Sequence, residues 1–448
     1  MSSDAPACVA LRNQVPADWD VPALASVTDF QEGPGILAKD FRDSGVPLLR
    51  LRNIETPTVE LGGCNFLDPE LVAKRWRHFG LAEGDFLIST SASLGRVSVV
   101  GPDAVGAIPY TGIIRFRSAS PKLHHKYLRA FLSSSAFIQQ AEQMATGSVI
   151  RHFGPSHLRQ MAIALPPLDE QLHIAEVFDV LDARIALLRE TNATLESIAQ
   201  ALFKSWFVDF DPVRAKSQGL APAGMDEATA ALFPDSFQGS ALGPIPSAWQ
   251  LSPVYEMATF INGAAYKAFE PNADRRGRPI IKIAELKSGV TTQTAFSAVD
   301  MHKKYLIKTG DILFSWSGNP DTSIDTFVWA NESAWLNQHI FRVLPHTDTD
   351  RAFVLQLLRQ LRPVFAELAR NKQTTGLGHV TVADMKRLLV AKPNAEALTA
   401  FARVAGPIQS RMFVNEQQAQ TLAALRDTLL PRLISGQLRL PQAEALVA

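Results

Sequence analysis

The chain has 448 residues, of which 46% are apolar, with 44 basic and 44 acidic side chains and two cysteines. This length predicts two or three domains, and the zero formal net charge argues against a protein that binds nucleic acid indiscriminately through excess positive charge. Cys8 and Cys64 are too few for a disulfide framework or a zinc site, and no stretch resembles a secretion signal or a membrane span. We therefore expect a soluble, cytoplasmic protein in a reducing compartment.

Residues 1–14 have the composition of a loose tail, and residues 15–168 are expected to form a first domain. The domain opens with Val15-Pro16-Ala17-Asp18-Trp19, and apolar segments between turn residues predict several short strands. The segment 45–52 predicts a strand with one apolar face and one face of Arg50 and Arg52. The other expected elements are a Gly-Asp hairpin turn and strand at 83–89, a short helix at 127–143, a Thr-Gly loop at 145–148 and a strand at 161–165.

Residues 169–210 have the pattern of one long helix, because no Gly or Pro interrupts them after Pro167. Such a helix is about 60 Å long at about 1.5 Å per residue, so it needs a partner helix. Asn192 is a polar residue in an otherwise mostly apolar series, and one such residue can fix the register of a coiled coil. The series, in alternating steps of four and three, is Ile174, Phe178, Leu181, Ile185, Leu188, Asn192, Leu195, Ala199, Leu202 and Trp206.

The partner is predicted at residues 395–435, where Leu422, Leu425, Leu429, Leu430 and Leu433 repeat the spacing of 195–206. Pro407 either starts the regular part of this second helix or kinks it. A linker rich in Gly, Pro and Ala is expected at 211–244, with its aromatic residues packed along the helices. Residues 436–448 are expected to form a C-terminal tail.

The second domain, residues 245–394, repeats the first in order. Ile245-Pro246-Ser247-Ala248-Trp249 opens it, and a strand at 277–283, a Gly-Asp turn and strand at 309–315, a helix at 351–369 and a Thr-Gly loop at 374–377 follow. Together the segments predict an α+β fold duplicated in tandem, with two long helices. The second domain carries about five more basic than acidic residues and the first long helix about five more acidic than basic ones.

Catalytic and cofactor motifs are missing from the sequence. There is no Gly-x-Gly-x-x-Gly, no P-loop and no Asn/Asp-Pro-Pro-Tyr/Phe segment, and Pro234-Asp235 lies far from Glu285-x-Lys287. His124 and His125 are adjacent, so they do not face one metal site. Two domains carried by long helices, with no catalytic motif in the sequence, predict a recognition protein rather than an enzyme.

Basic residues at matching places in the two halves are the candidates for DNA contact, because Arg, Lys, Asn and Gln are the usual donors to base edges and phosphates. Arg96 lies in a loop of small residues that permits a close approach to a backbone, and the matching loop, 315–319, offers Trp316 and Asn319 instead. Each candidate is also an ordinary solvated surface residue when taken alone. The candidates are Arg50, Arg52, Arg96, Arg151, Lys267, Arg278, Lys282, Lys287 and His379.

Five segments resemble the specificity subunit of type I restriction–modification systems. They are Leu-Pro-Pro-Leu-Asp-Glu-Gln (165–171), the stretch from Leu-Phe-Lys-Ser-Trp-Phe to Ala-Lys (202–216), Ala-Leu-Phe-Pro-Asp-Ser-Phe (231–237), Leu-Gly-Pro-Ile-Pro (242–246) and Leu-Arg-Asp-Thr-Leu-Leu-Pro-Arg-Leu-Ile-Ser-Gly-Gln-Leu (425–438). The resemblance covers the helices and the linker, and the two domains match only weakly.

The resemblance implies two target-recognition domains that each read one part of a bipartite site in double-stranded DNA. It also implies that the two long helices pair antiparallel, set the spacing and dock two methyltransferase (modification) subunits, and that the complex recruits a restriction (translocase–nuclease) subunit. S-adenosylmethionine, ATP and Mg would then belong to those partners, and this chain would hold no cofactor and contact no membrane. A coiled-coil scaffold without DNA contact, and a specificity module of a related restriction enzyme, are the alternatives.

Overall fold

The computed structural model describes residues 6–54, 57–90, 97–144, 153–373 and 377–439. The predicted site residues Arg96 and Arg151, and the loop at 145–148, lie outside these ranges. The chain forms two compact units. Unit 1 contains Met1–Ile185 and Thr421–Ala448, and unit 2 contains Ala186–Gln420.

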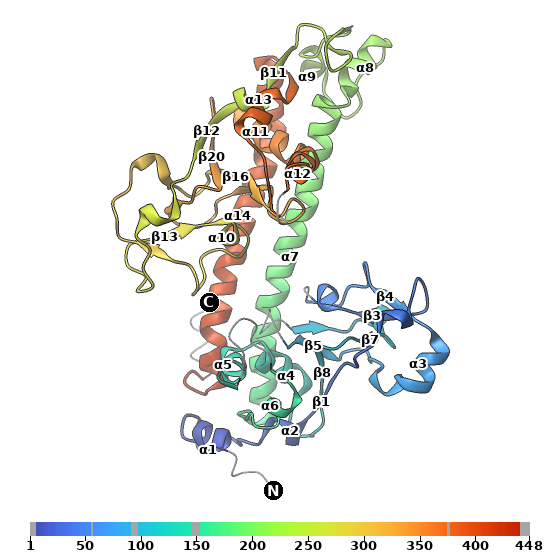
Figure 1. Cartoon of the computed structure of the whole chain (residues 1–448), viewed down its shortest axis with the longest axis vertical. Helices are drawn as coiled ribbons and strands as arrows, with labels where there is room; N and C mark the ends of the chain where they lie inside the picture. The colour runs from blue at the N-terminus through green and yellow to red at the C-terminus, as the bar shows by residue number, and fades with distance from the viewer. Residues whose placement is uncertain (1–5, 55–56, 91–96, 145–152, 374–376, 440–448) are drawn as a thin grey trace. The chain divides into compact units, whose positions relative to one another are not determined.

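Two helices of 40 residues each are divided between these units, namely α7 (Leu168–Phe207) and α14 (Ala395–Ile434) (Figure 1). The remainder of each unit is called its head. The head of unit 1 contains α1 (Pro6–Arg12), α2 (Leu24–Val27), β1 (Thr28–Glu32), β2 (Phe41–Arg42), β3 (Val46–Leu49), β4 (Asn65–Leu67), α3 (Pro69–Arg75), β5 (Phe86–Ser89), β6 (Val97–Val99), β7 (Ile108–Pro109), β8 (Ile113–Ser118), α4 (His125–Leu132), α5 (Ser135–Met144) and α6 (Pro155–Leu158), with 3-10 helices η1 (Ala38–Asp40), η2 (Leu51–Ile54), η3 (Arg77–Phe79) and η4 (Pro102–Ala104). The head of unit 2 contains α8 (Asp211–Ser217), α9 (Glu227–Ala231), β9 (Phe237–Gln238), β10 (Ile245–Pro246), β11 (Gln250–Pro253), β12 (Ala258–Asn262), β13 (Arg278–Ile281), α10 (Ile283–Ser288), β14 (Phe296–Ser297), β15 (Leu306–Ile307), β16 (Ile312–Ser315), β17 (Ser317–Gly318), β18 (Asp325–Val328), β19 (Ala334–Leu336), β20 (Ile340–Pro345), α11 (Asp350–Gln360), α12 (Arg362–Arg370), β21 (Gly378–His379), α13 (Val382–Arg387) and β22 (Leu389–Lys392), with η5 (Val254–Glu256), η6 (Tyr266–Phe269) and η7 (Lys303–Tyr305).

The two heads contain the same pair of sheets. In the first head, one sheet has the antiparallel order β1-β8-β5-β6 and the other the order β2-β4-β3-β7, with β3 and β7 parallel. In the second head the corresponding orders are β12-β20-β16-β18 and β14-β13-β19-β15, with β13 and β19 parallel. The tandem α+β fold predicted from the sequence is therefore confirmed. The heads differ at the edges of the mixed sheet, where β2 extends one side in the first head and β15 the opposite side in the second.

The two long helices pair within each unit. In unit 2, the Asn192 amide donates to the Met412 carbonyl (2.9 Å), and further along α7 the Phe203 ring contacts Phe401 (5.9 Å between centroids). In unit 1, Asp182 binds Arg426 (2.6 Å) and Glu170 binds Arg439 (2.8 Å). In both units, rising numbers on α7 meet falling numbers on α14 and, for Arg439, on the segment just after it, so the helices run antiparallel as predicted. The seam residues Ile174, Phe178, Leu181, Ile185, Leu188, Ala199 and Trp206 are all buried.

A Pro-x-x-Trp turn anchors each head to the helices. Trp19 donates its backbone N–H to the Pro16 carbonyl and Trp249 donates to the Pro246 carbonyl, both at 3.1 Å, and each tryptophan is 1% exposed. Trp19 packs in one core with the end of α14, and Trp249 packs against Phe207 at the end of α7. The linker is also packed, because the side chains of Val213 and Phe233 are buried in the same core as Trp249, as the sequence analysis expected.

Of the two alternatives expected for Pro407, the start of the helix is excluded, because α14 begins at Ala395 and continues through Pro407. Two other local expectations were wrong. Each predicted short helix is a pair, α4 with α5 and α11 with α12, because the Ser134 hydroxyl caps the break in the first and Pro363, which has no N–H, lies in the first turn of α12. The Gly-Asp turns do not close hairpins, since β5 and β16 each pair with strands that follow them.

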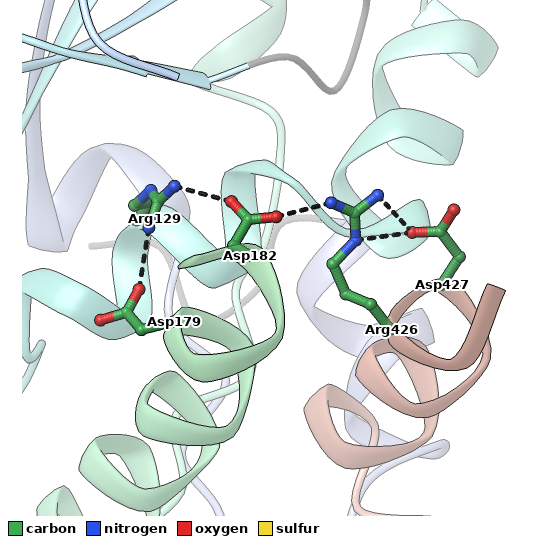
Figure 2. A network of polar contacts seen from close by, with 5 residues as sticks. All are labelled: Arg129, Asp179, Asp182, Arg426 and Asp427. Carbon is green, nitrogen blue, oxygen red and sulfur yellow. Dashed lines mark hydrogen bonds and ion pairs between the residues drawn. The ribbon is translucent and has the colours of Figure 1, made fainter. Parts of the chain in front are cut away.

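A charged network joins the first head to both long helices, and Figure 2 shows Asp182 between two arginines. Asp182 of α7 accepts from Arg129 of α4 (2.7 Å) and from Arg426 of α14 (2.6 Å). Arg129 also binds Asp179 (2.8 Å), and Arg426 also binds Asp427 (2.8 Å). Burial acts to lower the pKa of Arg426, but Asp427 and Asp182 outweigh it and raise that pKa. The side chain of Asp182 is 18% exposed. If its arginine partners were removed, water could therefore hydrate the charge of this carboxylate only in part.

No helix among the described residues has the length and apolar character needed to cross a membrane.

We predict that Asp182→Asn lowers the free energy of unfolding by about 2 kcal/mol, because two charge-assisted bonds are weakened at a mostly buried site. Asp427→Asn is the matched control, since the side chain of Asp427 is 65% exposed, and its cost is expected to stay below about 0.5 kcal/mol. Urea unfolding followed by circular dichroism measures both, and equal costs for the two variants would contradict the prediction.

Candidate nucleic-acid interface

Two predicted site residues occupy the same place in the two heads. Arg50 follows β3 directly, and Lys282 follows β13 directly. In the parallel ladder Leu49 lies opposite Pro109 of β7, and Ile281 lies opposite Leu336 of β19, so the two following residues are structurally equivalent. Arg50 and Lys282 are called the strand-end cations.

The expectation of a basic strand face was wrong at these positions. The strands end at Leu49 and Ile281, so Arg52 lies in η2 rather than on a strand. The physical reason is a side-chain cap that turns the chain into a helix. The Arg50 N–H donates to Asn53 Oδ1 (2.8 Å), and the Lys282 N–H donates to Glu285 Oε2 (3.0 Å).

Both strand-end cations lie over aromatic rings. The Arg50 guanidinium is 5.0 Å from the centre of the Phe41 ring and 5.5 Å from that of Tyr110. The Lys282 ammonium is 5.3 Å from the centre of the Tyr266 ring. Such contacts restrict a long side chain while leaving its charge available. The buried Arg50 Nε has no hydrogen-bond partner among the described residues.

The other described candidates are spread over the heads. Arg52, Lys267, Arg278 and His379 are exposed. The guanidinium of Arg278 lies 5.7 Å from the centre of the Trp335 ring, and Lys267 follows Tyr266 in η6. Lys287 is less free, because its ammonium donates to the Thr322 carbonyl. His379 in β21 pairs with Ser317 of β17, beside Trp316.

Three chain segments meet at the same point in each head. In the first head, Thr90 after β5 donates its N–H to the Gly112 carbonyl (2.9 Å), and Phe153 donates to the Thr90 carbonyl (3.3 Å). In the second head, Trp316 after β16 donates to the His339 carbonyl (3.3 Å), and Val380 donates to the Trp316 carbonyl (2.8 Å). This shared backbone frame brings His379 next to the loop between β19 and β20.

In each head, a glycine lets the loop that follows β7 or β19 approach the antiparallel sheet closely. A Cβ atom on Gly263 would lie 2.1 Å from the Asn337 carbonyl oxygen, and one on Gly33 would lie 2.1 Å from the Pro109 carbonyl oxygen. These distances are far below van der Waals contact, so only glycine permits the approach. The β19–β20 loop, residues 337–339, therefore lies in close backbone contact with the end of β12.

Polar residues of this loop were not among the candidates predicted from the sequence. The Trp316 indole N–H donates to Asn262 Oδ1 (3.2 Å), and its ring lies 5.6 Å from that of His339. The Gln338 amide nitrogen is 3.2 Å from His339 Nε2. Alignment of the two halves at the offset that relates the two long helices would have found these positions, because 337–339 then fall on Tyr110-Thr111-Gly112 and differ in every residue. Asn319, in contrast, closes its own loop by accepting from Asp321 and Thr322.

Carboxylates neutralise the charge of basic side chains near the shared backbone frame in both heads. In the first head, Asp85 binds Arg117 (2.5 Å), and this bond raises the pKa of Arg117. At the equivalent turn of the second head, Asp311 binds Arg342 (2.8 Å). In the part of the chain that the structure describes, no cluster of three His, Cys, Asp or Glu side chains could hold a metal ion.

Comparison with known protein families identifies the family to which the chain belongs. A model described as "Type I restriction modification DNA specificity domain" matches residues 16–197 and 246–420, most of the chain. The chain belongs to this family. The two matched regions are the two halves of the internal repeat.

Individual relatives match along most of their length. The specificity subunit of the type I restriction enzyme MjaIX from Methanocaldococcus jannaschii is 22% identical over 96% of this chain and 95% of its own. That of EcoKI from Escherichia coli K12 is 21% identical over 95% of this chain and 90% of its own. A crystal structure of the S subunit of a type I restriction–modification system from M. genitalium aligns with 15% identity and a TM-score of 0.48 over 94% of this chain and 96% of that one.

We predict that Gly263→Ala destabilises the protein by about 2 kcal/mol or more, because the new methyl group overlaps the Asn337 carbonyl and the loop must move. Gly239→Ala is the control, since an added Cβ there meets nothing within 4 Å, and its effect is expected to stay within about 0.5 kcal/mol. Denaturant unfolding compares the two variants. An unchanged unfolding midpoint for Gly263→Ala would show that the contact is not tight.

Proposed function

We propose that this protein is the non-catalytic DNA-recognition subunit of a type I restriction–modification complex. Residues 15–168 and 245–394 are its target-recognition domains, and each reads one part of a bipartite site in double-stranded DNA. The observation that carries the proposal is the duplicated frame, which presents a strand-end cation and one loop of differing sequence in each head. Phosphate contact by cations and base contact by loop side chains are the two parts of sequence-specific DNA binding.

The duplicated helices support docking of two identical partners. Leu187 on α7 and Val414 on α14 fall at equivalent positions of the repeat, and their side chains are 51% and 50% exposed. A single exposed apolar side chain is ordinary, so the support comes from the repetition of one at the same position in both halves, as two copies of one partner would require. These partners are two methyltransferase subunits, and the assembly recruits a translocase–nuclease subunit.

The chemistry belongs to those partners. S-adenosylmethionine binds the methyltransferase subunits, and ATP and Mg act with the translocase–nuclease. This chain supplies binding and spacing only, and the complex acts in the cytoplasm.

We predict that the isolated chain binds DNA weakly and that binding becomes sequence-specific when the methyltransferase partner is added. The cause is that a few cations give mainly salt-dependent, sequence-independent affinity until a second protein closes around the duplex. Gel shifts with the reconstituted complex on randomised DNA measure this. A complex without sequence preference would favour a coiled-coil scaffold instead.

We also predict that a heptad inserted into both long helices changes the gap between the half-sites and leaves the half-sites themselves unchanged. The insertions go between Leu188 and Asn192 in α7 and between Asn415 and Ala419 in α14, so that the seam keeps its period. Seven residues add about 10 Å, which corresponds to about three base pairs. Long-read mapping of modified adenines gives the result, and new half-site sequences would contradict it.

A further inference from the structure

The two heads share one part of the candidate interface and differ in another. The shared part is the strand-end cation, Arg50 or Lys282, with its N–H capped by a side chain three residues later and its charge over an aromatic ring. A feature common to both heads cannot distinguish two different half-sites. It therefore fits the sequence-independent contact to a phosphate.

The differing part is the loop that follows β7 or β19. The same backbone bonds hold it in both heads, from Thr90 to Gly112 and from Trp316 to His339. In the first head Glu32 accepts the N–H of Gly112 (3.0 Å). In the second head the equivalent residue, Asn262, accepts instead from the Trp316 indole (3.2 Å). One frame with different side chains is what base recognition in two different half-sites requires.

Gln338 is the best-equipped residue of the second loop. Its amide nitrogen lies 3.2 Å from His339 Nε2, and the His339 ring lies 5.6 Å from that of Trp316. The imidazole thus orients the amide, and the indole, held by Asn262, supports the imidazole. An amide uses one N–H for this contact, which leaves its other N–H and its carbonyl with no partner among the described residues. The residue is half-buried, so the amide is both held and accessible.

We propose that Gln338 reads an adenine in the half-site bound by the second head, that His339 positions its amide, and that Lys282 contacts a phosphate. A glutamine carbonyl accepts from adenine N6 while its N–H donates to N7, and this bidentate pair is specific in the major groove. The inference rests on the proposed DNA-recognition function and assigns the base-reading task within it.

The test uses the full chain reconstituted with its methyltransferase partner and DNA duplexes in which each base pair of both half-sites is changed in turn. Gln338→Ala should reduce the preference for one A·T pair about 10- to 100-fold, in the half-site of the second head alone. Gln338→Glu keeps the shape but replaces the donor, so the preference at that position should move toward cytosine, whose N4 donates. The matched control is Gln293→Ala, an exposed glutamine of the same head, which should change nothing.

The Lys282→Ala variant tests the proposed phosphate contact. It should weaken binding to all sequences alike and reduce the slope of log K against log salt by about one. His339→Ala should reduce discrimination at the same base pair as Gln338→Ala, and its effect should vanish in the Gln338→Ala background, because it acts through that amide.

The outcomes distinguish failure of the Gln338 assignment from failure of the proposed function. Uniform loss of affinity in Gln338→Ala, with every base preference retained, would overturn the assignment while the proposed function survives. A preference that moves away from adenine to thymine or guanine in Gln338→Glu, or a base-specific effect of Lys282→Ala, would also overturn it. Absence of any sequence preference in the unmodified complex would overturn the proposed function itself.

Discussion

The fold depends on the burial of one apolar seam. A 40-residue helix with a stripe of Leu, Ile and Phe is unstable alone in water, because most helical stability in proteins comes from packing an amphipathic face. Here the partner comes from the other half of the same chain, and each compact unit combines the N-terminal part of one long helix with the C-terminal part of the other. The heads are attached where the seam ends, through Trp19 and Trp249. The position of each recognition frame along its unit is therefore set by the helix pair.

The polar positions of the seam have diverged between the units. Unit 1 has Arg129, Asp182 and Arg426 in a charged network. The equivalent positions of unit 2 are the neutral Gln356, Gln409 and Ala199, and the buried Gln356 amide has no partner among the described residues. Unit 2 joins α11 to α7 elsewhere, through the Arg359–Glu196 ion pair. The apolar seam is shared by the two units, whereas their charged contacts lie at different positions around it.

The sequence was informative where periodicity alone determines structure. The spacing of Ile174 to Trp206 predicted the helix and its partner, and Asn192 was correctly identified as a polar seam residue. Contacts between distant segments could not be predicted. The aromatic rings over Arg50 come from β2 and from the residue after β7, and the ring packed against His339 comes from Trp316, which Asn262 holds. Strand lengths were also overestimated, because the caps at Asn53 and Glu285 end the ladders after four residues.

The division of the long helices affects the order in which the protein can fold during synthesis. Unit 2 is one continuous stretch, residues 186–420, and its core can close as soon as that stretch leaves the ribosome. The core of unit 1 includes Leu429, Leu433 and Ile434 beside Trp19, so it closes last although its head is made first. Contacts this distant along the chain are slow to form, and the emerging first head keeps apolar surface uncovered until residues 429–438 have been made. The N-terminal half of the nascent protein is therefore exposed to aggregation for longer than unit 2.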